Sequence, residues 1–297
     1  MKLYIEGFRG PWGWVGDYEK VSKFDIVSNA DEADVIFQCD PGNWRLNERH
    51  LERKIVIANV LDFSEWLGGN PEIENYVQSF CKRATKVTAI SKKVIYQLKE
   101  RGIDAGMFYY PSQVSSEMVD DLRGIPRKNR IISFCRLGDP GKKLDVAAKA
   151  FIDSDFEKAG WLYWLCGPES PIIPKHKQIK VMGYMPKEVL VASIASSKLT
   201  IMPSIGEGLG LPAIESTLLN TWSMVRSIEP MVDVFQGTAK YFSDDDHLLK
   251  ALNDVYGLIC GSSYPSIGDH QLDMWKRDVA FGEFERLIVG VYNDYRS

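Results

Sequence analysis

The feature that most constrains this chain is an alternation of short apolar runs with amphipathic helical stretches. The apolar runs predict strands over residues 2–8, 35–39, 54–60, 86–90, 130–135, 161–166, 179–182 and 199–203. Helical stretches follow several of them. One spans residues 92–101, begins after the capping residue Ser91 and ends at Gly102. Strands that alternate with helices in this way predict an α/β architecture with parallel sheets.

The alternation lapses once, in a segment rich in glycine, proline and basic residues. This segment covers residues 122–130 (LRGIPRKNR), and strand–helix alternation restarts directly after it. We therefore expect two α/β domains, residues 1–125 and 126–274. A final amphipathic stretch, residues 271–295, has the apolar spacing of a long surface helix.

The composition excludes several classes of protein. With 36 basic and 40 acidic residues the net charge is −4. The overall charge therefore does not indicate a protein that binds nucleic acid or anionic lipid. Neither a signal peptide nor a bilayer-spanning apolar run is present. The 5 cysteines, odd in number and widely spaced, predict reduced thiols in a cytoplasmic protein. Zinc-protease, nucleophile-elbow and P-loop motifs are missing as well.

The most informative segment is PSIGEGLGLPAIESTLLN, residues 203–220. A predicted strand ends there, a glycine-rich loop follows, and Pro212 suits the first turn of a helix. Glycines let backbone amides approach a ligand closely, and the start of a helix is electropositive, so a phosphate-bearing ligand fits this loop. Glu207 and Glu215 flank the loop, and a carboxylate suits the hydroxyl pair of a sugar or ribose. In the alternative interpretation, a glutamate at the helix start only complements the dipole.

Glu207 and Glu215, within E-G-L-G-L-P-A-I-E, resemble the E-x7-E signature of the retaining GT-B glycosyltransferases of family 4. Residues 84–103, 133–151 and 183–204 resemble further segments of that family, in the same order. The resemblance implies the GT-B form of the α/β class, with two Rossmann-like domains facing each other across a cleft. It also implies that residues 275–297 cross back to the first domain. The chain is similar to the compact, virus-encoded members.

The same resemblance implies a donor site in the second domain. Arg136 and Lys142 match the basic pair that holds the donor diphosphate, and a guanidinium and an ammonium both suit phosphate oxygens. A solvated basic face is the alternative interpretation for both. Glu207 matches the acid near the donor sugar, and Glu215 matches the acid that binds ribose. Backbone and base contacts are implied at Gly208, Leu209, Gly210, Leu211, Gly167, Gly183 and Tyr184.

The first domain resembles the family less closely. Gly10 and Gly13 lie after the first strand, where the family has a glycine-rich loop that reaches the donor or the acceptor. Trp12 and Trp14, in the same stretch, either stack on a sugar or pack in the core or at a hinge. Where many members carry a His before an Asp, this chain has Leu61 and Asp62, which leaves Asp62 as the polar candidate for catalysis.

The resemblance implies an enzyme that moves a hexose from a UDP- or GDP-sugar, such as UDP-glucose or GDP-mannose, to a carbohydrate or glycolipid hydroxyl, with retention. No separate cofactor is expected, and no metal, because Arg136, Lys142 and a helix start can neutralise the diphosphate. The run at residues 244–246 resembles a metal-binding D-x-D but is better interpreted as a helix cap. The alternatives are a sugar-nucleotide epimerase or phosphorylase of the same fold, or a non-catalytic nucleotide-sugar-binding protein.

Overall fold

The computed structural model describes residues 1–7, 13–41, 49–61, 70–261 and 272–297. They form two compact units: unit 1 is Met1–Pro111 with Asp278–Ser297, and unit 2 is Ser112–Arg277. The division therefore falls earlier than the boundary between residues 125 and 126 that the basic segment suggested. Backbone hydrogen bonds give the reason. Ser112 N donates to Trp275 O at 3.0 Å and Arg277 N donates to Val114 O at 2.7 Å. The two segments where the chain changes unit, near residues 112 and 277, are therefore bonded to each other within unit 2.

Unit 1 contains a parallel sheet whose described strands lie in the order β2-β1-β3-β4-β5-β6. The strands are β1 (Lys2–Glu6), β2 (Asp25–Ile26), β3 (Val35–Cys39), β4 (Ile55–Val60), β5 (Lys86–Ala89) and β6 (Gly106–Met107). The helices are α1 (Val15–Val21), α2 (Arg49–Arg53), α3 (Pro71–Arg83) and α4 (Lys92–Glu100). Every residue of β3 and β4 is buried, as expected for central parallel strands covered on both faces.

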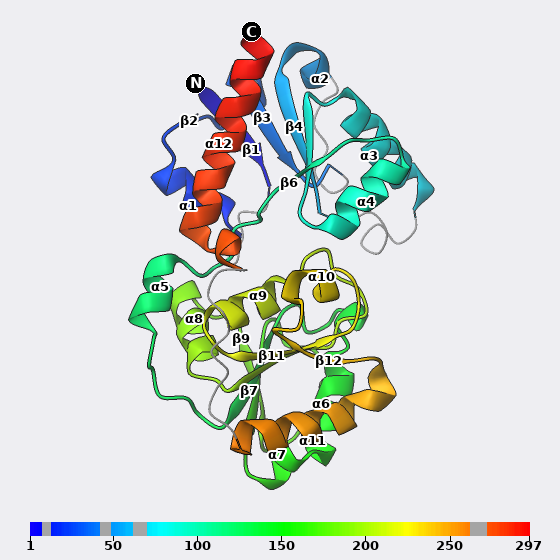
Figure 1. Ribbon diagram of the computed structural model, residues 1–297, viewed down its shortest axis with the longest axis vertical. Helices are drawn as coiled ribbons and strands as arrows, with labels where there is room; N and C mark the ends of the chain where they lie inside the picture. The colour runs from blue at the N-terminus through cyan, green and yellow to red at the C-terminus, as the bar shows by residue number, and fades with distance from the viewer. Residues whose placement is uncertain (8–12, 42–48, 62–69, 262–271) are drawn as a thin grey trace. The chain divides into compact units, whose positions relative to one another are not determined.

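Helix α12 (Arg277–Arg296) returns the end of the chain to unit 1, as expected (Figure 1). Its Phe284 lies 5.3 Å from Trp14 and 4.8 Å from Phe37, measured between ring centroids. Trp14 is only 1% exposed, so it belongs to the aromatic core and the sugar-stacking interpretation is wrong for it.

Unit 2 contains a second parallel sheet, with its described strands in the order β12-β11-β10-β7-β8-β9. The strands are β7 (Arg130–Phe134), β8 (Leu162–Cys166), β9 (Ile179–Gly183), β10 (Leu199–Met202), β11 (Trp222–Arg226) and β12 (Lys240–Phe242). The helices are α5 (Ser116–Asp121), α6 (Leu144–Asp153), α7 (Asp155–Lys158), α8 (Lys187–Ala195), α9 (Leu211–Leu218), α10 (Met231–Phe235) and α11 (Asp245–Gly261).

The strand order of unit 2 is that of the Rossmann fold, in which the direction of winding reverses between the first and fourth strands, here β7 and β10. Helices α6, α7 and α11 lie on one side of the sheet, and α8, α9 and α10 lie on the other (Figure 1). Sheets of this kind bind ligands beyond the carboxyl ends of the two strands at the reversal. The topology therefore predicts a ligand site at the loops that follow β7 and β10.

All 5 cysteines are described and none forms a disulfide, in line with the expected reduced state. No helix among the described residues combines the length and apolarity needed to cross a membrane.

Candidate functional site

The loops after β7 (residues 135–143) and after β10 (residues 203–210) lie side by side. Their strands are paired, and Ile205 N in the second loop donates to Gly141 O in the first at 2.9 Å. Both loops leave the carboxyl edge of the sheet, where a ligand of a doubly wound fold binds. The structure thus places the segments that contain Arg136, Lys142 and Glu207 next to one another.

The loop after β7 is shaped by Asp139, which caps the short 3-10 helix η2 (Pro140–Lys142). Its Oδ1 accepts from Gly141 N at 2.9 Å, while its Oδ2 accepts from the Arg136 guanidinium at 2.7 Å. The Arg136 side chain is 47% exposed, so its guanidinium remains accessible from solvent. The cap fixes the turn that carries Lys142, and the ion pair holds Arg136 against the same turn.

Lys142 and Glu207 form the polar link between the two loops. Lys142 Nζ lies 2.6 Å from Glu207 Oε1, and the two side chains are only 13% and 12% exposed. An ammonium from one loop and a carboxylate from the other are therefore held together, largely out of water. Groups of this kind can bind phosphate and hydroxyl oxygens of the same ligand.

Helix α9 begins at the end of the second loop, and its first residues explain why glycine is required there. Gly210 adopts a left-handed conformation with φ of 87°, and a Cβ at this position would lie 2.3 Å from Met231 Cε. Leu209 is 3% exposed and anchors the loop in the core. The helix starts at Leu211, at the end of the loop that contains Glu207, so the positive end of its dipole lies at this loop.

The structure gives the second glutamate different partners from the first. Glu215 lies within α9, is 4% exposed, and accepts from Gln113 N at 2.8 Å through Oε1. Burial raises the pKa of Glu215 to about 7, against the opposing effects of the Gln113 bond and the Lys187 charge. Burial also lowers the pKa of Lys187, together with the charge of Arg277, to about 8. Glu215 thus links helix α9 to the backbone at Gln113.

The residues expected near a nucleotide base lie at the carboxyl ends of β8 and β9, on the same edge of the sheet. Gly167 N donates to Gly183 O at 2.9 Å, and both glycines have positive φ, 149° and 67°. A Cβ on Gly167 would lie 2.0 Å from Cys135 O, so only glycine fits there. The Tyr184 side chain is 54% exposed.

Two neighbouring groups bear on the chemistry. Burial raises the pKa of the Cys135 thiol to about 12, so this thiol is protonated near neutral pH and is a poor nucleophile.

Asp244 caps α11 by accepting from His247 N at 3.1 Å, and Asp245 pairs with Arg226, which confirms the helix-cap interpretation of this acidic run. Within the described ranges, no group of three or more His, Cys, Asp or Glu side chains could hold a metal ion.

Three further expected residues belong to unit 1. Gly13 is buried and precedes Trp14, the N-cap residue of α1. Gly10 and Asp62 lie outside the described residues, as does Trp12.

Two residues have roles that the sequence did not predict: Asp139 caps the turn that carries Lys142, and Gln113 binds Glu215. Asp139 precedes Pro-Gly, a recognised turn signature. Gln113 acts through its backbone amide, which leaves no side-chain signal.

Several solved structures are similar in fold to this chain. HepE (Alr3699) from Anabaena, in complex with UDP-glucose, matches with a TM-score of 0.71 at 11% identity, over 97% of this chain and 99% of that one. Sucrose-phosphate synthase (tll1590) from Thermosynechococcus elongatus matches with a TM-score of 0.69 at 11% identity, over 88% and 74%. The pneumococcal O-GlcNAc transferase GtfA, in complex with UDP and GlcNAc, matches with a TM-score of 0.68 at 13% identity. That match covers 86% of this chain but 56% of GtfA.

Comparisons with protein-family models and with curated proteins found no match. The structural matches and the two parallel sheets establish the GT-B fold, with two Rossmann-like units, as expected from the sequence.

Proposed function

We propose that this protein is a glycosyltransferase that takes a hexose from a nucleotide-diphosphate sugar, with a UDP-sugar as the first candidate. The observation that carries the proposal is the Lys142–Glu207 pair, which joins the β7 loop to the loop that leads into α9, where the winding of the unit 2 sheet reverses. The GT-B structures solved with UDP-glucose and with UDP and GlcNAc support the choice of donor class. GDP-sugars remain part of the proposal because the base contacts that we propose at Gly167 and Gly183 come from the backbone.

In the proposed complex, the diphosphate lies over the amino end of α9. Lys142 donates to one phosphate oxygen, and Arg136, 47% exposed, turns its guanidinium from Asp139 to another. The backbone amides of residues 208–211 add weaker donors, favoured by the helix dipole. Gly167, Gly183 and Tyr184 border the base at the neighbouring strand ends.

Glu207 is proposed to hold hydroxyl groups of the donor sugar. Its carboxylate is an acceptor for two hydroxyl protons, and Lys142 Nζ at 2.6 Å from Oε1 holds it in place. Lys142 thereby contacts both the phosphate and the acid that positions the sugar. One carboxylate oxygen of Glu215 is bonded to Gln113 N, and the proposed ribose contact is made by the other oxygen.

The proposed reaction breaks the bond between the anomeric carbon and the donor phosphate oxygen. The sugar acquires oxocarbenium character while negative charge grows on the departing diphosphate, and Lys142, Arg136 and the α9 start stabilise that charge. The acceptor hydroxyl attacks the anomeric carbon and its proton passes to the departing phosphate oxygen, which gives retention. The cations supply the counter-charge, so we propose metal-independent transfer to an acceptor bound by unit 1, with Asp62 as its polar candidate.

A donor panel tests the proposal. The full chain is incubated with UDP-glucose, GDP-mannose and related sugars, with and without EDTA, while nucleotide release and sugar isomerisation are followed. Slow, EDTA-resistant release of nucleoside diphosphate that Lys142→Met abolishes is the expected result. Isomerisation without release would instead identify an epimerase, and binding without turnover would identify a non-catalytic receptor.

A further inference from the structure

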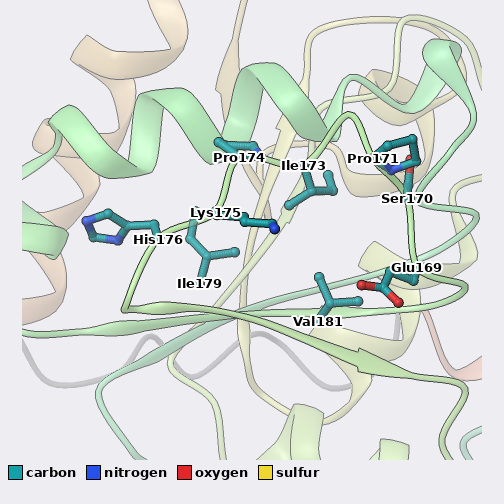
Figure 2. Close-up of a pocket in the computed structure, with 9 residues that line it drawn as sticks. All are labelled: Glu169, Ser170, Pro171, Ile173, Pro174, Lys175, His176, Ile179 and Val181. Carbon is teal, nitrogen blue, oxygen red and sulfur yellow. The ribbon is translucent and has the colours of Figure 1, made fainter.

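A cavity of unit 2 lies along the edge strand β9, and one of its lining residues, Ser170, lies beside Gly138 of the β7 loop. Its volume is about 820 Å³, and Ile173, Ile179 and Val181 supply much of its apolar lining. Figure 2 shows Lys175 reaching across this apolar lining from the loop between β8 and β9, with the Glu169 carboxylate at the other end. The cavity thus combines an apolar floor with an ammonium group.

The loop beside this cavity is basic in an otherwise acidic chain. Between Glu169 and Glu188 the sequence contains no Asp or Glu, although the chain as a whole has a net charge of −4. Lys175, Lys177 and Lys180 are all exposed. The His176 imidazole is 3.6 Å from Glu157 Oε1, so His176 is left out of the positive patch. Opposite charge on a partner would be attracted to the three lysines.

The tip of the same loop is apolar. It reads Pro-Ile-Ile-Pro over residues 171–174, with Ile173 9% exposed and Ile172 42% exposed. Ile173 therefore anchors the tip in the core, whereas Ile172 presents its side chain to solvent. Prolines have no backbone N–H, and Ile173 N donates to Ser170 O at 3.3 Å, so the tip has few amide donors to satisfy. Such a segment can enter the interfacial region of a membrane at low cost.

We propose that residues 170–180, the basic loop and the start of β9, dock on an anionic membrane surface. Ile172 enters the headgroup region, Lys175 binds a lipid phosphate over the apolar floor of the cavity, and Lys177 and Lys180 add electrostatic attraction. Exposed aliphatic side chains next to lysines are typical of interfacial membrane binding, which favours a lipid surface over an acidic peptide. This inference depends on the surface of unit 2 alone and stands independently of the proposed transferase activity.

Co-sedimentation of the full chain with vesicles tests the proposal, at physiological ionic strength. Vesicles of phosphatidylcholine alone are compared with vesicles that also contain phosphatidylglycerol. We expect binding to the anionic vesicles only. Each lysine near an anionic surface contributes about five-fold, so the triple variant Lys175→Gln/Lys177→Gln/Lys180→Gln should bind on the order of 100-fold more weakly. Ile172→Ser should weaken binding several-fold.

The matched control replaces three exposed lysines of unit 1, Lys82→Gln/Lys92→Gln/Lys99→Gln, which changes the net charge equally. The control should keep nearly all vesicle binding, and circular dichroism checks that all the variants fold. Absence of wild-type binding to anionic vesicles would overturn the proposal, as would equal losses in the two triple variants or no effect of Ile172→Ser. Lysine-dependent binding to a poly-glutamate peptide, without vesicle binding, would also overturn it and indicate an acidic protein partner.

Discussion

The Lys142–Glu207 pair should be strongly coupled in the folding free energy. At 2.6 Å, two unit charges attract by about 6 kcal/mol at an effective dielectric constant of about 20, and removal of the pair from water offsets much of this. Lys142→Met leaves a carboxylate that is 12% exposed without its cation, so we expect the free energy of unfolding to fall by about 3 kcal/mol. In Lys142→Met/Glu207→Gln no unpaired charge remains, and about half of the loss should be recovered.

Urea unfolding of the wild type, both single variants and the double variant gives the coupling energy as a double-mutant cycle. Lys149→Met is the matched control, because the Lys149 side chain is 68% exposed and its distance to Asp145 is 3.8 Å. That control should change the free energy of unfolding by less than about 0.5 kcal/mol. Additive effects of the two single substitutions would refute the view that this pair links the two loops.

Three further outcomes follow from the same geometry. Arg136→Ala should weaken donor binding by about 1.5–3 kcal/mol, measured by titration calorimetry; an unchanged dissociation constant would remove Arg136 from the phosphate site. Because the pKa of Glu215 in the folded chain is about 7, above its ordinary value of 4.5, its contribution to stability is present below about pH 4.5 and lost as the pH rises through about 7. Melting curves of the wild type and Glu215→Gln should therefore differ most in favour of the wild type at about pH 4.5 and below, and a difference that does not vary with pH would contradict the assignment. Gly210→Ala should lower the melting temperature, because the added Cβ would meet Met231 Cε at 2.3 Å in a backbone with φ of 87°; an unchanged melting temperature would show that the loop relaxes freely.

The sequence predicts the central strands well because parallel strands buried on both faces are continuous apolar runs. Residues 35–39 match β3 in full, and the ends of the other predicted strands either coincide with the observed ends or differ by at most two residues. Strand β11 is not predicted from the sequence, because Ser223 and Arg226 interrupt its apolar run. Their polar atoms are satisfied inside the fold, for example by the bond from Arg226 Nε to Pro203 O at 3.1 Å.

The position of the division between the units also depends on contacts that the sequence does not display. Residues 122–130 have the composition of a linker, yet two of their arginines, Arg127 and Arg130, make structural hydrogen bonds. Arg127 donates to Ser197 O and Leu219 O, both at 2.9 Å, and Arg130 donates to Ser193 O at 2.6 Å. Composition alone cannot distinguish such inward-facing arginines from a solvated basic segment.

The candidate donor site shows the same contrast. Motif spacing brings Lys142 and Glu207 into one site, because their loops follow paired strands. The partner of Glu215 is the backbone amide of Gln113, 102 residues earlier in the chain. A motif of side chains cannot predict a bond to such a backbone amide.

Titration of the full chain with UDP by calorimetry tests the central claim most directly, that a diphosphate binds between the β7 loop and the start of α9. The account predicts one UDP per chain, bound at least ten-fold more weakly by Lys142→Met and equally well by the control Lys149→Met. Equal UDP affinity of the wild type and Lys142→Met would contradict it.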